Sequence, residues 1–279
     1  MSILITGAQG FIGRWLQDYL SKKQCEFISW SNEICDLKNE TFKVDTVVHL
    51  AAETLPERFI NNPERAYQTN IAGTLSVLEF CRRNNAGLIF ISTSGVYGEK
   101  NGAISEEDNI KPRNPYSLSK HIGEQLCYQY FRDFSVPVTV LRLFNVYGAG
   151  QDKKFLISYI IDSIINNMEL ILKSPYSKRD FIYVEDVCSA IYQCLKSEIK
   201  GFEVYNLGSG VAQSVIEITE KINILCNSSF FYDIMKNKIT VEQSCVYANI
   251  DKIKLNIHWN PEISIDEGLK RIIRYHEIM

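Results

Sequence analysis

The chain has 279 residues, of which 46% are hydrophobic and 23% are charged, a composition typical of globular proteins. Its formal net charge of −3 and the absence of long basic runs exclude a nucleic-acid-binding surface. No stretch approaches the ~20 apolar residues of a membrane span and no secretory leader precedes Ile3, so we expect a cytoplasmic protein.

The first predicted element is a short buried strand, Ile3–Ile5, followed by a glycine-rich turn and a helix that runs to about Leu20. The turn has the spacing G-x-x-G-x-x-G. Gly7 permits the tight turn, Gly10 lets the backbone approach a pyrophosphate, and Gly13 lets the helix pack on the strand. The amides at the start of the helix would face those phosphates. The sequence therefore predicts a dinucleotide-binding turn.

Residues 26–30 are the second predicted strand, and its end bears on cofactor choice. A carboxylate there accepts the ribose hydroxyls of NAD and repels the 2′-phosphate of NADP. Ser31 and Asn32 occupy that place, and Glu33 follows slightly late. Because neutral groups tolerate a 2′-phosphate and Arg14 could pair with it, the sequence favours NADP(H) over NAD(H). The alternative for Arg14 is an exposed helix residue.

Two polar residues stand in the next predicted elements, a buried strand at 44–52 and a long helix at 63–84. His49 lies inside the apolar strand, where a hydrogen-bonded core histidine is more common than a catalytic one. Asn70 lies midway along the helix. Asparagine is unfavourable there, which predicts a local bend or a hydrogen-bonding role.

A fourth strand at 87–93 leads into a hydroxyl-rich turn, and such a strand end faces the crevice where α/β proteins bind ligands. Downstream, Tyr116 and Lys120 are four residues apart on a predicted helix and therefore share one face. An ammonium near a phenol favours the phenolate, so we expect Lys120 to lower the pKa of Tyr116 toward neutral pH. The alternative is an ordinary amphipathic helix.

The assembled motifs resemble the extended short-chain dehydrogenase/reductase family, particularly its nucleotide-sugar members. The segments concerned are TGAQGFIG at 6–13, CDL at 35–37, VVHLAA at 47–52, TNIAGT at 69–74, ISTSGVYG at 91–98, YSLSK at 116–120, LRLFNVYG at 141–148 and RDFIYVEDV at 179–187. The resemblance extends over nearly the whole chain.

This resemblance implies an α/β fold, with a doubly wound parallel sheet of Rossmann type. Residues 1–150 would bind NAD(P), with strands returning from about 180–190 and 203–208. Residues 151–279 would form a smaller interleaved region, mostly for substrate. The resemblance also implies a homodimer through helices around 64–84 and 116–133, with these apolar residues at the interface: Ile71, Leu75, Leu78, Leu126, Tyr130 and Phe131.

The resemblance also implies roles for individual residues. Thr93 would bind the reacting sugar oxygen, Tyr116 would be the acid/base and Lys120 its partner. Asp36 would accept from the adenine amino group. The full set of expected cofactor contacts is Gly7, Gln9, Gly10, Phe11, Ile12, Arg14, Ser31, Asn32, Asp36, Leu37, Leu50, Ala51, Ala52, Asn70, Tyr116 and Lys120.

The expected substrate contacts are Glu53, Thr93, Ser94, Asn145 and Arg179. A guanidinium grips a diphosphate in a bidentate manner, which suits Arg179, although it could instead pair with Asp180 or Asp186. The substrate would be a nucleotide-diphosphate sugar. The base would be selected at roughly 153–178 and 200–245, which match no pattern.

Dehydrating members of the resembled family follow the hydroxyl with an Asp-Glu pair, but this chain has Ser94 and Gly95, which cannot exchange protons near neutral pH. Dehydration is therefore rejected. Reduction of a 4-keto (6-deoxy) sugar by NAD(P)H is favoured, with 4-epimerisation by retained NAD as the alternative. A second alternative is a dinucleotide-binding module without catalysis, against which the intact Thr93, Tyr116 and Lys120 argue.

Eight scattered cysteines form no CxxC pair and have no neighbouring histidine pair. They indicate buried thiols of a reducing compartment, and we expect no metal site.

Overall fold

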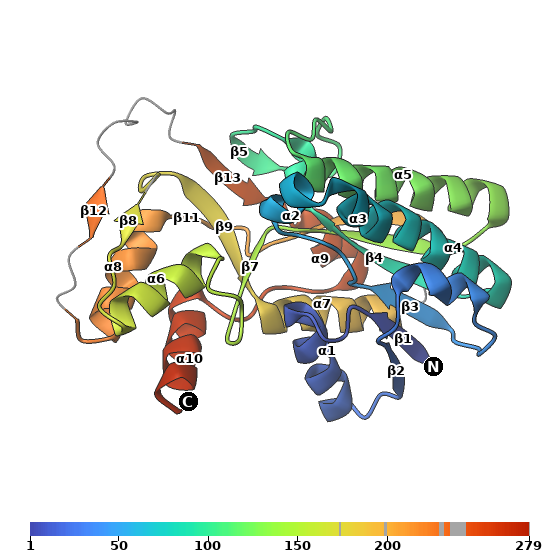
Figure 1. Cartoon of the computed structure of the whole chain (residues 1–279), viewed down its shortest axis with the longest axis horizontal. Helices are drawn as coiled ribbons and strands as arrows, with labels where there is room; N and C mark the ends of the chain where they lie inside the picture. Colours follow the sequence, from blue (N-terminus) through green and yellow to red (C-terminus); the bar gives the residue numbers. More distant parts are fainter. Residues whose placement is uncertain (173, 198–199, 229–231, 235–243, 279) are drawn as a thin grey trace.

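Six parallel strands form the main sheet of the protein, in the order β10-β6-β4-β3-β1-β2 (Figure 1). The computed structural model describes residues 1–172, 174–197, 200–228, 232–234 and 244–278. β1, β3 and β6 are buried along their whole length, as expected for apolar strands covered on both faces. The strands are β1 (Ile3–Thr6), β2 (Phe27–Trp30), β3 (Thr46–His49), β4 (Gly87–Thr93), β6 (Val138–Leu143) and β10 (Phe202–Leu207).

Helices cover both faces of this sheet, which makes it doubly wound as predicted. α1 (Phe11–Lys22) and α7 (Val184–Lys196) share one hydrophobic core, and they lie below the sheet in Figure 1. α4 (Gly73–Asn84) and α5 (Pro115–Phe134) pack on the opposite face around a second core. The order and direction of the strands place the ends of β1, β3, β4 and β6 along one edge, where ligands of such sheets bind.

The predicted helix at 63–84 contains a distortion at Asn70. It consists of α3 (Pro63–Tyr67), a π-helical turn η2 (Gln68–Ala72) and then α4. The Asn70 amide accepts from the Glu53 backbone nitrogen at 2.7 Å and donates to the Glu53 carbonyl at 2.9 Å. Of the two expectations for Asn70, the hydrogen-bonding role is confirmed, and the π-helical turn interrupts the regular helix at this residue. The amide anchors the chain where it leaves β3.

A second sheet and three helices form the smaller part, on the left of Figure 1. Its strands run β11-β9-β13-β5, with β7 also paired to β9. The bounds are β5 (Gly102–Ile104), β7 (Asn145–Tyr147), β9 (Lys178–Tyr183), β11 (Ala212–Ser214) and β13 (Cys245–Ala248). The helices are α6 (Leu156–Ile165), α8 (Val215–Leu225) and α10 (Ile265–Ile278), which share a third core.

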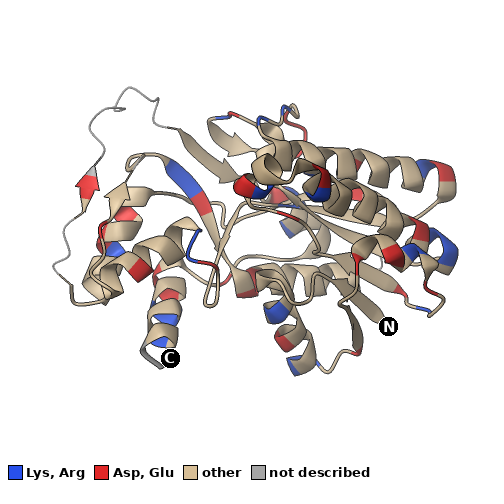
Figure 2. Cartoon of the chain, in the orientation of Figure 1, with Lys and Arg blue, Asp and Glu red and all other residues tan. Residues whose placement is uncertain are grey.

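The remaining elements are short. They are η1 (Ile34–Asn39), α2 (Pro56–Asn61), η3 (Ser94–Tyr97), α9 (Asp251–Ile257) and the paired strands β8 (Ile171–Leu172) and β12 (Asp233–Ile234). Acidic and basic residues are interspersed along the described helices and strands in Figure 2. No described helix has the length and apolar character needed to span a bilayer. Residues 173, 229–231 and 235–243, part of the region expected to select the base, lie outside the described residues.

Two expectations about packing are corrected by the structure. The segment at 180–190 does not add a strand to the main sheet, because β9 belongs to the smaller sheet and α7 follows it; only β10 returns. Val187 and Ile191 recur at helical spacing in α7 and bury one face of it.

Among the residues expected at a dimer interface, Leu78 and Tyr130 belong to the monomer core, whereas Leu75 is 41% exposed.

Candidate active site

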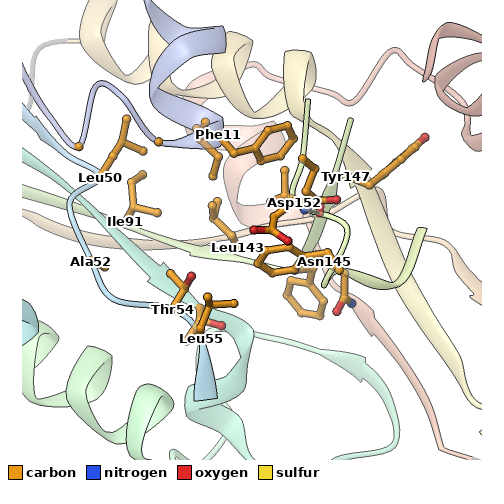
Figure 3. Close-up of a pocket in the computed structure, with 18 of the residues that line it drawn as sticks. Phe11, Leu50, Ala52, Thr54, Leu55, Ile91, Leu143, Asn145, Tyr147 and Asp152 are labelled. Atoms are coloured by element: carbon orange, nitrogen blue, oxygen red, sulfur yellow. Dashed lines mark hydrogen bonds between the residues drawn. The ribbon is translucent and has the colours of Figure 1, made fainter. Parts of the chain in front are cut away.

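A cavity of about 840 Å³ lies between the edge of the main sheet and the smaller part of the protein. In Figure 3, Leu50 and Ala52 line one side of it, and Asn145 and Asp152 lie on the opposite side. Its walls include the glycine turn, the end of β4 and the start of α5 from one part, and β7 and β9 from the other. The cavity therefore joins the predicted cofactor and substrate regions.

The glycine turn at one end of the cavity fits a bound pyrophosphate. Gly7 has φ +70°, and a Cβ there would lie 2.6 Å from the Ala51 nitrogen. A Cβ at Gly13 would lie 2.3 Å from the Gly7 carbonyl oxygen, so helix α1 can approach β1 only without a side chain. Gly10, Phe11 and Ile12 line the cavity where α1 begins. Backbone N–H groups at the N-terminus of a helix, next to a turn without side chains, can donate hydrogen bonds to the pyrophosphate of a dinucleotide.

A second cavity, of about 270 Å³, lies on the other side of the same turn and shares Gly7 and Gly10 with the first. Ser31 and Asn32 line it, as does Ala51, at the ends of β2 and β3. Gln9 contributes from the turn itself. This position beside β1 and β2 suits the adenosine half of a dinucleotide.

Arg14, expected beside Ser31 and Asn32, lies instead in the larger cavity. Its guanidinium donates to the Gln9 carbonyl at 2.6 Å and to the Gly150 carbonyl at 3.3 Å. Among the described residues, the cation that lines the smaller cavity is Arg65, from α3. The sequence does not indicate Arg65, because the packing of α3 against the end of β2 depends on the tertiary fold.

Three further residues expected at the cofactor line neither cavity. Asp36 is exposed on η1, Leu37 is fully buried beside it, and Asn70 is buried beneath the Glu53 backbone. Leu50 and Ala52 line the larger cavity as expected.

The start of helix α5 places the predicted catalytic residues. Asn114 caps the helix by accepting from the Ser117 backbone nitrogen at 2.8 Å, and Pro115 occupies the first helical position. This cap directs Tyr116 and Lys120 into the larger cavity, where Thr93 at the end of β4 also lies. The Thr93 hydroxyl is also close enough to the Tyr116 phenol to lower its pKa. The three predicted catalytic residues are therefore brought together.

The pKa of Tyr116 differs from the expectation. Burial raises it to about 12, and the nearby Thr93 hydroxyl lowers it only in part. Burial lowers the pKa of Lys120 to about 8, and its ammonium lies 4.4 Å from the centre of the Phe90 ring. Burial is the largest cause of both shifts, and the Lys120 charge is not among the causes that act on the pKa of Tyr116. The protein groups alone therefore keep the phenol neutral.

His49 is a hydrogen-bonded core residue, as predicted. Its Nδ1 lies 2.7 Å from the Thr6 hydroxyl and its Nε2 lies 3.2 Å from the Thr74 hydroxyl. Burial, with a smaller contribution from the Lys120 charge, lowers its pKa to about 3. The imidazole therefore stays neutral and joins β1, β3 and α4.

Arg179 lines the larger cavity from β9 and is not paired with either neighbouring aspartate. Asp180 accepts from the backbone nitrogens of Ser209 and Gly210, and Asp186 from those of Glu262 and Ile263. With both carboxylates occupied, no described residue forms an ion pair with the Arg179 guanidinium. It is available for an anion in the cavity.

The other predicted substrate residues divide into two groups. Glu53 and Asn145 line the larger cavity, and the Asn145 amide donates to the Asp180 carbonyl at 2.8 Å. Ser94 begins η3 and lies outside the cavity wall. Two neighbouring hydroxyl residues, Ser92 and Thr93, therefore line the cavity, and Ser92 is the more buried of the two.

A buried polar network behind α5 was not indicated by the sequence. Arg142 on β6 donates to both carboxylate oxygens of Glu124, at 3.0 and 2.8 Å, and Glu124 also accepts from the Ser92 hydroxyl. Arg142 further donates to the Tyr97 hydroxyl at 2.9 Å. Glu124 lies one turn after Lys120 on the same helix, and this spacing was the feature of the sequence that could have indicated a polar network here. The network fixes α5 against β4 and β6 behind the predicted catalytic residues.

Comparisons with known proteins agree with this geometry. Residues 3–208 match the profile of the NAD dependent epimerase/dehydratase family. The chain is 31% identical, over 98% of its length and 97% of the relative's, to a putative UDP-glucose 4-epimerase of Methanocaldococcus jannaschii. Its structure resembles UDP-glucose 4-epimerase of Thermotoga maritima, solved with UDP-glucose (25% identity, 100% and 99% coverage, TM-score 0.92). It also resembles RMD of Pseudomonas aeruginosa, solved with NADPH (28% identity, 100% and 99% coverage, TM-score 0.89).

Proposed function

Because the chain belongs to the NAD dependent epimerase/dehydratase family, we propose that it is a nucleotide-sugar 4-epimerase that retains its dinucleotide during the reaction. The observation that supports this proposal is the larger cavity. It extends from the glycine turn past Thr93 and Tyr116 to Arg179, so a dinucleotide and a nucleotide sugar can meet at the phenol. The similarity to UDP-glucose 4-epimerases favours this reaction over the reduction that the sequence favoured.

In the proposed reaction, Tyr116 moves the proton and Thr93 holds the oxygen. Tyr116 accepts the proton of the C4 hydroxyl as the C4–H bond breaks, while the Thr93 hydroxyl donates to the developing alkoxide. A bound oxidised nicotinamide would supply the hydride acceptor, and its positive charge would favour the phenolate form of Tyr116 that accepts this proton. The 4-keto sugar then rotates in the cavity and presents its other face to the cofactor. Tyr116 returns the proton to the C4 oxygen as the opposite configuration forms. The same two residues therefore serve both directions.

Lys120 and Arg179 would hold the two ligands. No hydrogen-bond acceptor among the described residues is recorded for the Lys120 ammonium, which lines the cavity beside Tyr116. It can therefore donate to hydroxyls of a bound ligand. Arg179 would bind the diphosphate of the sugar nucleotide, with Asn145 beside it. Residues 1–150 with β10 would thus bind the dinucleotide, and residues 151–279 mostly the substrate.

Dehydration remains excluded on physical grounds. Ser94 and Gly95 supply no carboxyl group next to Thr93. A Cβ at Gly95 would lie 3.3 Å from the Ser117 Cβ and 3.4 Å from the Thr93 hydroxyl oxygen. The missing carboxyl group, rather than a lack of space, therefore argues against dehydration.

A 4-ketoreductase using NADPH is the second candidate. It is favoured by the resemblance to RMD solved with NADPH and by the neutral Ser31 and Asn32 in the smaller cavity. Thr93 and Tyr116 would act in the same way, with a single proton transfer to the alkoxide.

Retention of the dinucleotide separates these two candidates. We expect native mass spectrometry of the freshly purified protein to show one dinucleotide bound to each chain, because an epimerase regenerates it in every turnover. The dinucleotide should survive gel filtration. A protein that emerges empty, and binds NADPH only when it is added, would instead support the reductase.

We also propose that the protein is a homodimer through α4 and α5. Leu75 on α4 is exposed in the monomer, as are Leu118 and Tyr128 on α5. A two-fold arrangement would bury these apolar side chains against their copies. Light scattering should then give twice the chain mass of 32.0 kDa, and a monomer mass at micromolar concentration would contradict the proposal.

A further inference from the structure

Two carboxylates line the larger cavity from opposite parts of the protein. Glu53 follows the end of β3, and Asp152 lies between β7 and α6. In Figure 3, Ala52 marks the side from which Glu53 comes, and Asp152 lies on the opposite side. No other acidic residue among those described lines this cavity. A ligand that fills the cavity would therefore have a carboxylate on each side.

Backbone hydrogen bonds hold both carboxylates in place. One oxygen of Glu53 accepts from the backbone nitrogens of Thr54 and Leu55, at 3.1 and 3.2 Å. One oxygen of Asp152 accepts from the Lys154 backbone nitrogen at 2.9 Å. The second oxygen of each carboxylate has no such partner within the described part of the chain, so it can accept from a ligand hydroxyl.

The lysines nearest to Asp152 in the sequence do not neutralise it. Lys153 lies 2.7 Å from the carboxylate of Asp162. Lys154 lies 3.0 Å from the carboxylate of Glu57. Within the described ranges, neither of the two cavity carboxylates forms an ion pair, and both therefore contribute a full negative charge to the wall.

The three described cations of the cavity wall have other acceptors. Arg14 donates to the carbonyls of Gln9 and Gly150. In the proposed function, Arg179 binds the diphosphate and Lys120 donates to ligand hydroxyls. No described cation of the wall is therefore left for a negative charge on the sugar ring.

Glu53 is also tied to the reacting end of the cavity. Its backbone is bonded by the Asn70 amide, which donates to the Ser119 hydroxyl at 2.9 Å. Ser119 in turn donates to the Tyr116 carbonyl at 2.7 Å. Because short hydrogen bonds connect Glu53 to Tyr116, its carboxylate belongs to the part of the cavity that would hold the sugar.

We propose that Glu53 and Asp152 restrict the substrate to nucleotide sugars with an uncharged sugar ring and exclude those that carry a carboxylate at C6. Hydroxyls of a neutral sugar can donate to the free carboxylate oxygens. A C6 carboxylate would instead meet two negative charges in a cavity that shields it from water, without a cation to compensate it. This inference rests on the nucleotide-sugar binding of the proposed function and names the class of sugar.

The test compares binding within pairs of ligands that differ only at C6. Isothermal titration calorimetry of the full-length protein with its dinucleotide bound measures Kd for UDP-glucose and UDP-glucuronate, and for GDP-mannose and GDP-mannuronate. In the parent we expect the neutral member of a pair to bind at least about tenfold more tightly than the acidic one. Glu53→Gln combined with Asp152→Asn keeps the shape of both side chains and should reduce this ratio to about threefold or less. Each single variant should give an intermediate ratio.

Glu99→Gln is the matched control, because Glu99 is exposed and lines neither cavity. It should leave the ratio within about twofold of the parent value. The proposal is overturned if the parent binds the acidic member as tightly as the neutral one, or if the double variant leaves the ratio unchanged. A protein that binds neither pair would overturn the nucleotide-sugar assignment as well. Because the readout is binding, a lack of C4 inversion would remove the epimerase assignment alone.

Discussion

Tyr116→Phe is expected to lower kcat by about 10²–10⁴-fold while the protein remains folded and its dinucleotide remains bound. Phenylalanine keeps the ring and its edge-to-face contact with Phe59, whose centroid lies 6.3 Å away. Only the hydroxyl, which faces the cavity together with Thr93, is lost. The proposed acceptor of the C4 proton is then missing.

Steady-state turnover of a nucleotide sugar, with the dinucleotide content measured on the same sample, checks this expectation. Tyr128→Phe is the matched control, because Tyr128 lies on the same helix, lines neither cavity and keeps its ring in the variant. It should turn over as the parent does. If Tyr116→Phe is within a few-fold of the parent, Tyr116 is not the proton carrier and the mechanism is wrong.

Arg142→Met is expected to destabilise the protein by about 3–5 kcal/mol, the typical cost of leaving one partner of a buried ion pair uncompensated. Arg142 and Glu124 are 6% and 3% exposed, and the variant would leave the Glu124 carboxylate with only the Ser92 hydroxyl. Methionine fills much of the volume, so the cost comes from the unpaired charge rather than from a cavity. Urea unfolding measures it as a fall in the transition midpoint.

Two further variants separate charge from packing. Arg113→Met removes an exposed partner of Glu99 and should cost less than about 1 kcal/mol. Arg142→Met combined with Glu124→Leu removes both buried charges and should be more stable than Arg142→Met alone. If the double variant is less stable than Arg142→Met alone, the unpaired buried charge of Glu124 is not the cause of the destabilisation.

The proposed catalytic residues could be named from the sequence because they lie in local patterns. The spacing of Tyr116 and Lys120 follows from helical periodicity, whereas Thr93 was distinguished from the neighbouring hydroxyls by the resemblance to the family. The glycine turn was predictable because a tight turn before a helix requires glycine. These features depend on fewer than ten consecutive residues.

Features that depend on distant contacts were not predictable. Arg65 meets Glu33 only because α3 packs beside the end of β2, so the sequence favoured Arg14 instead. The pKa of Tyr116 depends on how deeply the fold encloses the phenol, and burial reversed the expected direction. Leu78 looked like an interface residue because helix periodicity does not distinguish the core from a subunit contact.

The most direct measurement of the proposed function is proton NMR of UDP-glucose, UDP-N-acetylglucosamine, UDP-glucuronate and GDP-mannose, each incubated with the purified protein and no added cofactor. We predict that one of these sugars inverts at C4 until an equilibrium mixture forms, with no net change in nicotinamide absorbance. The proposal would be contradicted if none of the four sugar nucleotides inverts at C4 and the protein instead oxidises added NADPH in the presence of a 4-keto sugar nucleotide. That result would establish a reductase.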